Sequence, residues 1–200
     1  MLLKASVLYN TKQSYTPPLE PYEFNRHALI VDTETVGSGP LIEIVEIAVG
    51  DIDGNIIYHS LVHPIYNPLP RTTKLQRFDK AEFAEAPEWP VMWPDLEALI
   101  SGKLLIAYNA AFDRRAIAAM CARHRHTSSE RGWRCAMELA RRTLGIRRAL
   151  TLGEACAQYG LEGGTHRAVR DVEATACLLK SLVTASEPPP HIRQQSRDHS

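Results

Sequence analysis

The feature that most constrains the fold is the stretch ALIVDTETVG, residues 28–37. Its first four residues are apolar and mostly branched, which is typical of a strand that is buried on both faces of a sheet. Side chains alternate along a strand, so Asp32 and Glu34 leave the same face side by side. Neighbouring carboxylates repel each other, and no basic residue lies near enough in the sequence to neutralise these two. The stretch indicates either a site for Mg²⁺ or Mn²⁺ or a strand end whose acids face water.

The composition, 44% hydrophobic and 23% charged over 200 residues, is that of an ordinary globular protein with one domain. No apolar run approaches the roughly 20 residues needed to cross a bilayer, and the N-terminus lacks a signal-peptide pattern. We therefore expect a cytoplasmic protein with no membrane partner. Four widely spaced cysteines are typical of small buried hydrophobes. Cys121, His124 and His126 fit no standard zinc spacing, so a zinc site is disfavoured.

Charge is distributed unevenly along the chain, although the net charge is zero. Residues 1–100 carry 7 Lys and Arg against 14 Asp and Glu, a net charge of −7. Residues 101–200 carry 16 against 9, a net charge of +7. Such asymmetry is an indication of contact with a polyanion, but a weak one, because folding mixes the two halves in space.

The order of elements predicts an α/β domain with a mixed sheet. Two strands are expected at 41–50 and 55–62, joined by the turn Asp53-Gly54, so the sheet starts with three antiparallel strands. Strands at 103–108 and 132–135 arrive through helical crossovers and should be parallel to the first. Helices are expected near 79–84 and over 95–100. A further helix should follow the segment 109–113 and run to about residue 123, and three more are expected over 137–144, 151–160 and 168–183. Pro94 should open the helix over 95–100.

Both ends of the chain are predicted to lie outside the domain. Residues 1–26 are polar and contain three prolines, so we expect a loosely packed arm. Its aromatic residues Tyr9, Tyr15, Tyr22 and Phe24 could still anchor it to the domain. The tail over 186–200 is rich in proline and polar residues, and we expect it to be disordered.

A second acidic position, Asp113, shares a predicted helix face with Ile117 and Met120 and therefore points to the apolar side. A buried carboxylate needs a partner. The alternative is an acid in the first turn that only favours the positive end of the helix dipole.

A third motif precedes the last helix in GGTHRAVRD, residues 163–171. Asp171 borders the apolar stripe of that helix in its first turn. His166 lies on the glycine-flanked loop, where its ring is free to turn towards whatever Asp171 holds. A lone His-then-Asp is more often part of a surface loop, so this motif gains weight only together with the other two.

In order, the motifs are Asp-x-Glu at a strand end, Asn-x-x-Phe-Asp entering a helix, and His-x-x-x-x-Asp entering another. Over about residues 27–185 they resemble the DEDDh branch of the proofreading-exonuclease, or DnaQ-like, superfamily. The sister DEDDy branch has tyrosine where this chain has Arg167. His166, five positions before Asp171, matches the DEDDh branch.

Within that family, 44–50 and 134–142 look most like the small stand-alone exonuclease X type, followed by the proofreading epsilon subunit of bacterial replicases. The resemblance implies a ribonuclease-H-like fold. Its five-stranded mixed sheet has three antiparallel and then two parallel strands and is flanked by helices. The exonuclease domain would cover residues 27–185.

The resemblance also implies the chemistry. It suggests a metal-dependent 3′→5′ exonuclease that hydrolyses phosphodiester bonds at single-stranded 3′ ends, DNA favoured, and releases nucleoside 5′-monophosphates. Two Mg²⁺ or Mn²⁺ ions would be held by Asp32, Glu34, Asp113 and Asp171. His166 would act as the general base towards the attacking water.

Substrate contacts are implied by the same resemblance at Thr33, Thr35, Val36, Asn109 and Phe112. The chain departs from the family at 36–38, where a second threonine, a glycine and a leucine wedge are common. The chain also lacks a histidine motif that is common in the family. Residues 76–79 occupy the corresponding position. Arg77 could replace that histidine as a phosphate contact, but a solvated loop arginine is the favoured interpretation.

Two other functions stay open. One is an RNA-trimming exoribonuclease of the ribonuclease T or oligoribonuclease kind, which shares the mechanism. The other is a non-catalytic nucleic-acid-binding or polymerase-associated module, although the filled catalytic positions count against it. A ribonuclease-H-type endonuclease is disfavoured by the motif spacings. A polymerase or a second copy of the chain as partner, and a pathway in repair, proofreading or RNA maturation, are left undecided.

Overall fold

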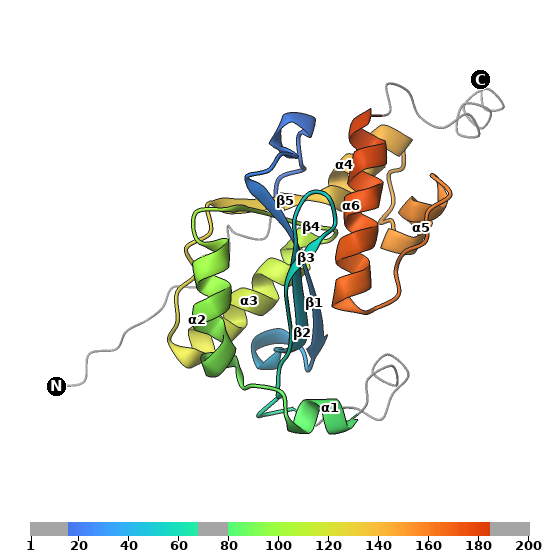
Figure 1. Cartoon of the computed structure of the whole chain (residues 1–200). Coiled ribbons are helices and arrows are strands. Elements are labelled where there is room, and N and C mark those ends of the chain that lie inside the picture. Colours follow the sequence, from blue (N-terminus) through green and yellow to red (C-terminus); the bar gives the residue numbers. More distant parts are fainter. Residues whose placement is uncertain (1–15, 68–79, 185–200) are drawn as a thin grey trace, which may run out of the picture.

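The computed structural model describes residues 16–67 and 80–184, and Figure 1 shows a single mixed sheet at their centre. The strands are β1 (Ala28–Val36), β2 (Glu43–Gly50), β3 (Ile56–Leu61), β4 (Leu104–Ala107) and β5 (Gly132–Cys135). Their order is β3-β2-β1-β4-β5. The β1–β2 and β2–β3 pairs are antiparallel, whereas β1–β4 and β4–β5 are parallel. The predicted ribonuclease-H-like sheet is confirmed.

Helices cover both faces of the sheet. They are α1 (Lys80–Ala84), α2 (Trp89–Ile100), α3 (Ala110–His124), α4 (Ala136–Leu144), α5 (Leu152–Ala157) and α6 (Ala168–Thr184). In Figure 1, α2 and α3 lie on one side of the sheet and α4, α5 and α6 on the other. The capping box that predicts the start of α5 is present, with Thr151 and Glu154 bonded reciprocally.

Helix α2 begins at Trp89, six residues before the predicted start at Asp95, and Pro94 lies inside it. The prediction treated Pro94 as a helix start because an interior proline removes a backbone donor. The structure retains the helix because five residues on one face are buried, namely Trp89, Met92, Trp93, Leu96 and Ile100. Burial of two tryptophans and three aliphatic side chains outweighs the lost hydrogen bond.

Strand β1 is buried on both faces, as predicted, and its alternation decides which layer each residue faces. Ile30 packs in the cluster that contains α4, α5 and α6. Leu29 and Val31 pack in the cluster that contains α2 and α3. Asp32 and Glu34 therefore face the α6 side, and Thr33 faces the α3 side. The strand does not end at these acids but continues to Val36, because β2 pairs with it as far as Glu43.

The described part of the N-terminal arm is packed, contrary to the expectation. Pro18 forms a parallel bridge with Cys135, and Leu19 is fully buried. Glu23 makes an ion pair with Arg134 of β5 at 2.6 Å. Tyr22 does not anchor the segment, since 78% of its surface is exposed. Phe24 does help to anchor it, since its side chain is partly buried against the core, whereas Tyr9 and Tyr15 lie outside the described residues. Backbone bonds and an ion pair to β5, whose partners are distant in sequence, complete the anchor.

Three of the four cysteines are buried thiols, as expected, and Cys177 on α6 is exposed. Across residues 16–67 and 80–184, no helix combines the length and apolar character needed to span a membrane. The expected disordered tail over 186–200 lies outside the described residues, as do residues 76–79.

Candidate active site

The acids of the first motif lie along β1 on the sheet face that α6 covers. Helix α6 brings Asp171 to this face from its first turn. Asp113 arrives from the opposite layer, in the first turn of α3. The candidate site is therefore assembled at β1 from both helical layers.

Asp171 is buried and shapes the loop before α6. Its Oδ1 accepts hydrogen bonds from the Thr165 amide at 2.9 Å and the Thr165 hydroxyl at 3.2 Å. Its Oδ2 accepts one from the His166 amide at 3.2 Å. One carboxylate thus closes the turn that carries the predicted general base.

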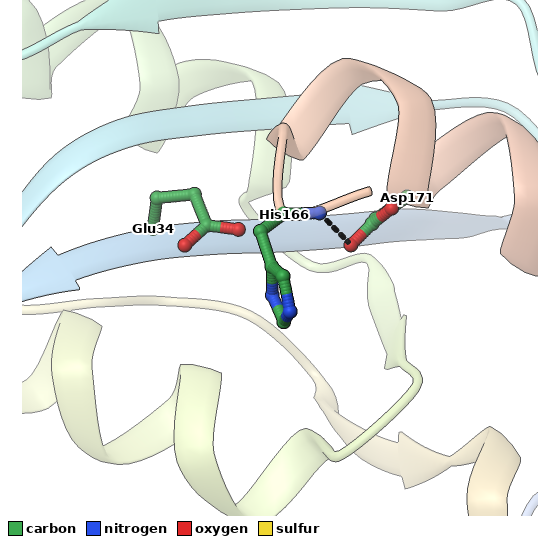
Figure 2. Close-up of side chains that lie close together, drawn as sticks. All are labelled: Glu34, His166 and Asp171. Atoms are coloured by element: carbon green, nitrogen blue, oxygen red, sulfur yellow. Dashed lines mark hydrogen bonds between the residues drawn. The ribbon is translucent and has the colours of Figure 1, made fainter. Parts of the chain in front are cut away.

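His166 lies beside Glu34 and Asp171, as Figure 2 shows. One ligand atom of each of these three residues lies within 4.8 Å of the others. His166 is exposed and has a positive φ of 56°, a conformation that few residues other than glycine adopt. Such local strain persists only where surrounding contacts hold it.

Asp113 is 3% exposed and is held from the α3 side of β1. Its Oδ1 accepts hydrogen bonds from the Thr33 amide at 3.0 Å and the Thr33 hydroxyl at 2.8 Å. Burial raises the pKa of Asp113 to about 7, although the Thr33 hydrogen bonds oppose this shift. A buried acid was expected to need a partner, and among the described residues Thr33 provides it.

Asp32 is close enough to the other acids for their charges to act on it. Burial raises its pKa well above the ordinary value, and repulsion from Asp113, Asp171, Glu34 and Glu46 adds to the shift. Among the described residues, no ion pair joins Asp32, Asp113 or Asp171 to a lysine or arginine. The site concentrates negative charge that a bound cation would neutralise.

The donor set fits a hard divalent cation. Its members are carboxylates, with one imidazole at the exposed side, and Mg²⁺ and Mn²⁺ prefer carboxylate oxygen. Burial, and after it repulsion from the neighbouring acids, raises the pKa of Asp32, and a bound cation would counter both effects. Cys121, His124 and His126 form no comparable group, because Glu34, His166 and Asp171 are the one set of three potential ligands that the described chain gathers.

The predicted substrate contacts fall in different places. Thr35 and Phe112 line a pocket of about 730 Å³. Thr33 is buried and bonded to Asp113. The Val36 side chain is buried against Val45 and Phe83, away from that pocket. Asn109 is exposed at the start of α3, where its side chain caps no backbone amide.

The pocket also contains residues that the sequence did not single out. Its wall is formed by the loop Gly37–Pro40 with Ile42, and by one face of α3 that includes Arg115 and Arg123. Recurrence of Phe112, Arg115, Ala119 and Arg123 every three or four residues could have indicated this face. Its orientation depends on which side of α3 packs on the sheet.

Glu46 is a second residue that sequence reasoning missed. It is fully buried in β2, and its charge contributes to the raised pKa of Asp32. The available signal was an acid in the middle of the apolar run IVEIAVG.

Comparison with known proteins was made by sequence and by structure. The family model described as Exonuclease matches residues 29–179. Exodeoxyribonuclease 10 of Escherichia coli is 30% identical over 165 residues, which cover 78% of this chain and 69% of the relative. A Mycobacterium tuberculosis protein described as a candidate bifunctional exonuclease/endonuclease is 27% identical over 168 residues. This match covers 78% of the chain but only 26% of the mycobacterial protein.

Solved structures share the fold at low identity. A 3′-exonuclease in a structure of histone mRNA stem-loop recognition has a TM-score of 0.66 at 16% identity, covering 80% of this chain and 65% of the other. The nuclease domain of 3′hExo, described as a DEDDh family member bound to rAMP, has a TM-score of 0.63 at 17% identity. That match covers 80% of this chain and 94% of the domain.

Proposed function

The chain belongs to the DEDDh, DnaQ-like family of 3′→5′ exonucleases, and from this premise we propose that it shortens single-stranded DNA from the 3′ end. The products would be nucleoside 5′-monophosphates. The observation that carries the proposal is the electrostatically unsatisfied cluster of acids around Asp32, with His166 at its exposed edge. A structural role alone would not favour three neighbouring acids, Asp32, Asp113 and Asp171, with which no lysine or arginine of the described residues forms an ion pair.

Asp32, Glu34, Asp113 and Asp171 would hold divalent cations in this proposal. When bound, a pair of Mg²⁺ or Mn²⁺ ions supplies Lewis-acid chemistry that activates water and neutralises the leaving oxygen. The protein contributes preorganisation. Thr33 fixes the Asp113 carboxylate through two hydrogen bonds, and the turn at Thr165 fixes the Asp171 carboxylate through three, counting the bond from His166.

His166 would accept a proton from the attacking water at a ring nitrogen. Its ring is exposed, whereas its backbone is bonded to Asp171. A group that takes up protons from water must be both accessible and held in place, and His166 meets both requirements.

The pocket lined by Thr35 and Phe112, the chain neighbours of Glu34 and Asp113, would accept the 3′-terminal nucleotide. Phe112, Ile42 and Pro40 offer apolar surface to a base, and Arg115 offers a positive charge to a phosphate. Neither kind of contact reads base edges, so cleavage would be independent of sequence.

Digestion of 3′- and 5′-labelled oligonucleotides, with and without Mg²⁺, tests the proposal. We expect mononucleotides to be released from the 3′ end in the presence of the metal, and a circular single strand to resist. Asp32→Asn should abolish release. Asp53→Asn, in the exposed β2–β3 turn, is the matched control and should be as active as wild type. Equal activity of Asp32→Asn and wild type would assign the digestion to a contaminant.

An exoribonuclease is the second candidate. It is supported by the RNA ligands of the structural neighbours, a histone mRNA stem-loop and rAMP. The 30% identical relative is named an exodeoxyribonuclease, which favours DNA. Rates on DNA and RNA oligomers of the same sequence and of several lengths distinguish the two. A polymerase or a second copy of the chain as partner stays a prediction.

A further inference from the structure

Glu46 is a buried charge that the proposed reaction does not use. It lies in the middle of β2, and none of its side chain is exposed. It pairs with Glu34 of β1 across the antiparallel ladder, so its side chain is on the face that α6 covers. A carboxylate in such a position is expensive unless it is bonded.

Glu46 has three partners. One is His59 of β3, whose Nε2 lies 3.0 Å from Oε1, and the other two come from the start of α6. The Arg167 Nε donates to Oε1 at 3.2 Å and to Oε2 at 3.3 Å, and the Arg167 Nη2 donates to Oε1 at 3.2 Å. The Ala168 amide donates to Oε2 at 3.0 Å. Glu46 therefore binds one side chain and one orphan backbone amide at the N-terminus of α6.

These contacts place His166 between two fixed points. On the N-terminal side of His166, the Asp171 carboxylate accepts hydrogen bonds from the backbone amides of Thr165 and of His166 itself. On its C-terminal side, Glu46 holds Arg167 and the Ala168 amide. His166 occupies the left-handed conformation between these anchors. Releasing one anchor would let the backbone relax and move the ring.

We propose that Glu46 is a positioning residue that fixes the His166 loop in its active geometry. It contacts neither the substrate nor the reacting atoms, and it acts through the backbone at Ala168 and the side chain of Arg167. The inference rests on the proposed role of His166 as general base.

Two further observations support this role over a purely structural one. Burial opposes ionisation of Glu46, but hydrogen bonds from His59, Ala168 and Arg167 lower its pKa, so the residue is charged. The charge of Glu46 also raises the pKa of Asp32, which means that it destabilises the ionised form of Asp32 when no cation is bound. A well-packed apolar residue avoids both penalties, since buried ion pairs often stabilise less than the hydrophobic side chains that replace them.

A double-mutant cycle with Glu46→Gln and His166→Ala tests the proposal. Glutamine keeps an acceptor for the Ala168 amide but removes the charge that holds Arg167. In the wild-type background we expect kcat to fall about 10- to 100-fold, because displacement of a catalytic group by about 1 Å has an effect of this size. The KM should stay within about threefold. In the His166→Ala background the same substitution should change kcat less than about twofold.

A second readout does not depend on activity. Hydrogen exchange of the His166 and Ala168 amides should accelerate in Glu46→Gln, while exchange in β4 should not change. Glu82→Gln, at an exposed position on the first turn of α1, is the matched control, because it removes a charge of the same kind without changing any hydrogen bond of Glu46. It should leave kcat and the exchange of both amides as in wild type. If Glu46→Gln does not fold, Arg167→Met removes the other half of the contact and should show the same non-additivity with His166→Ala.

Equal loss of kcat in both backgrounds, or unchanged exchange at His166 and Ala168, would overturn the proposal. Failure of the proposed function is distinguishable from this outcome. In that case the wild type digests no oligonucleotide, whereas the hydrogen-exchange comparison still decides whether Glu46 holds the loop.

Discussion

Two neighbouring strands carry acids, and the acids differ in what surrounds them. On β1, burial raises the pKa of Asp32 well above its ordinary value, and no described lysine or arginine forms an ion pair with it. On β2, Glu43 and Glu46 are buried at least as deeply, yet hydrogen bonds lower the pKa of both despite the opposing effect of burial. The difference lies in the number of donors that reach each carboxylate.

Glu43 is an acid whose carboxylate has a full set of hydrogen-bond donors. Its carboxylate accepts hydrogen bonds from three consecutive amides, Ile65, Tyr66 and Asn67, and from the Asn67 side chain. Arg123 lies 3.8 Å away. Such a residue organises the chain around it. An acid without these donors, such as Asp32, is instead available to a ligand.

The largest effect is expected at the acid that lacks donors. Asp32→Asn removes a charge that the proposed cations need, so kcat should fall by roughly 10³-fold or more. The free energy of unfolding without metal should not decrease, because the repulsion around Asp32 is relieved. A nuclease assay combined with urea denaturation measures both quantities. A stability loss as large as that of a Glu43 variant would remove the distinction between the two strands.

Next in size is the loss of a satisfied acid. Glu43→Ala leaves the amides of Ile65, Tyr66 and Asn67 without their acceptor, so the free energy of unfolding should fall by about 3 kcal/mol. Urea denaturation measures this change. Glu82→Ala, on the first turn of α1, is an exposed control that should change it by less than about 0.5 kcal/mol. A small effect at Glu43 would show that its hydrogen bonds do not stabilise the fold.

The pH dependence of the free energy of unfolding should report the protonation of Asp113. Its pKa in the folded protein is about 7, against 3.8 ordinarily, so the folded state binds the proton more tightly than the unfolded state. Stability without metal should therefore fall as the pH rises from about 4 to 7, by on the order of 3 kcal/mol. Asp113→Asn should reduce this dependence to the part that comes from Asp32, whose pKa is also raised, and should be more stable than wild type at pH 8. Thermal unfolding in a chelator between pH 5 and 8 avoids titration of Glu43 and Glu46, whose pKa values are lowered.

Added Mg²⁺ or Mn²⁺ extends the same measurement. A cation at pH 8 should raise the melting temperature of wild type. The rise should be smaller for Asp113→Asn, because the variant offers the cation one negative charge fewer. Equal stabilisation of the two proteins would place the cation elsewhere.

The smallest effect is expected at Thr33. Thr33→Val removes one of the two donors to Asp113 but retains the backbone amide and the shape of the side chain. Loss of one hydrogen bond corresponds to about 1 kcal/mol, so kcat should fall roughly fivefold with the KM unchanged. Steady-state kinetics on a short oligonucleotide measures both. An unchanged kcat would mean that the amide alone orients the carboxylate.

Much of the fold was predictable from local patterns. The apolar run of β1, the Asp53-Gly54 turn and the capping box at Thr151 each report on contacts a few residues away. The start of α2 was not predictable, because Pro94 argues locally against a helix interior that burial of tryptophan stabilises. The packing of residues 16–24 on β5 was missed for a similar reason, since the Glu23–Arg134 pair spans 111 residues.

By itself, the sequence determined which residue types follow one another at β1 and at the starts of α3 and α6, and alternation placed Asp32 and Glu34 on one face. Only the tertiary structure decided which acids have donors. The Arg167 and Ala168 groups reach Glu46 from more than 120 residues away, while no described basic side chain reaches Asp32. Alternation is a property of neighbouring residues, whereas saturation of a carboxylate depends on groups that only the folded chain brings into range.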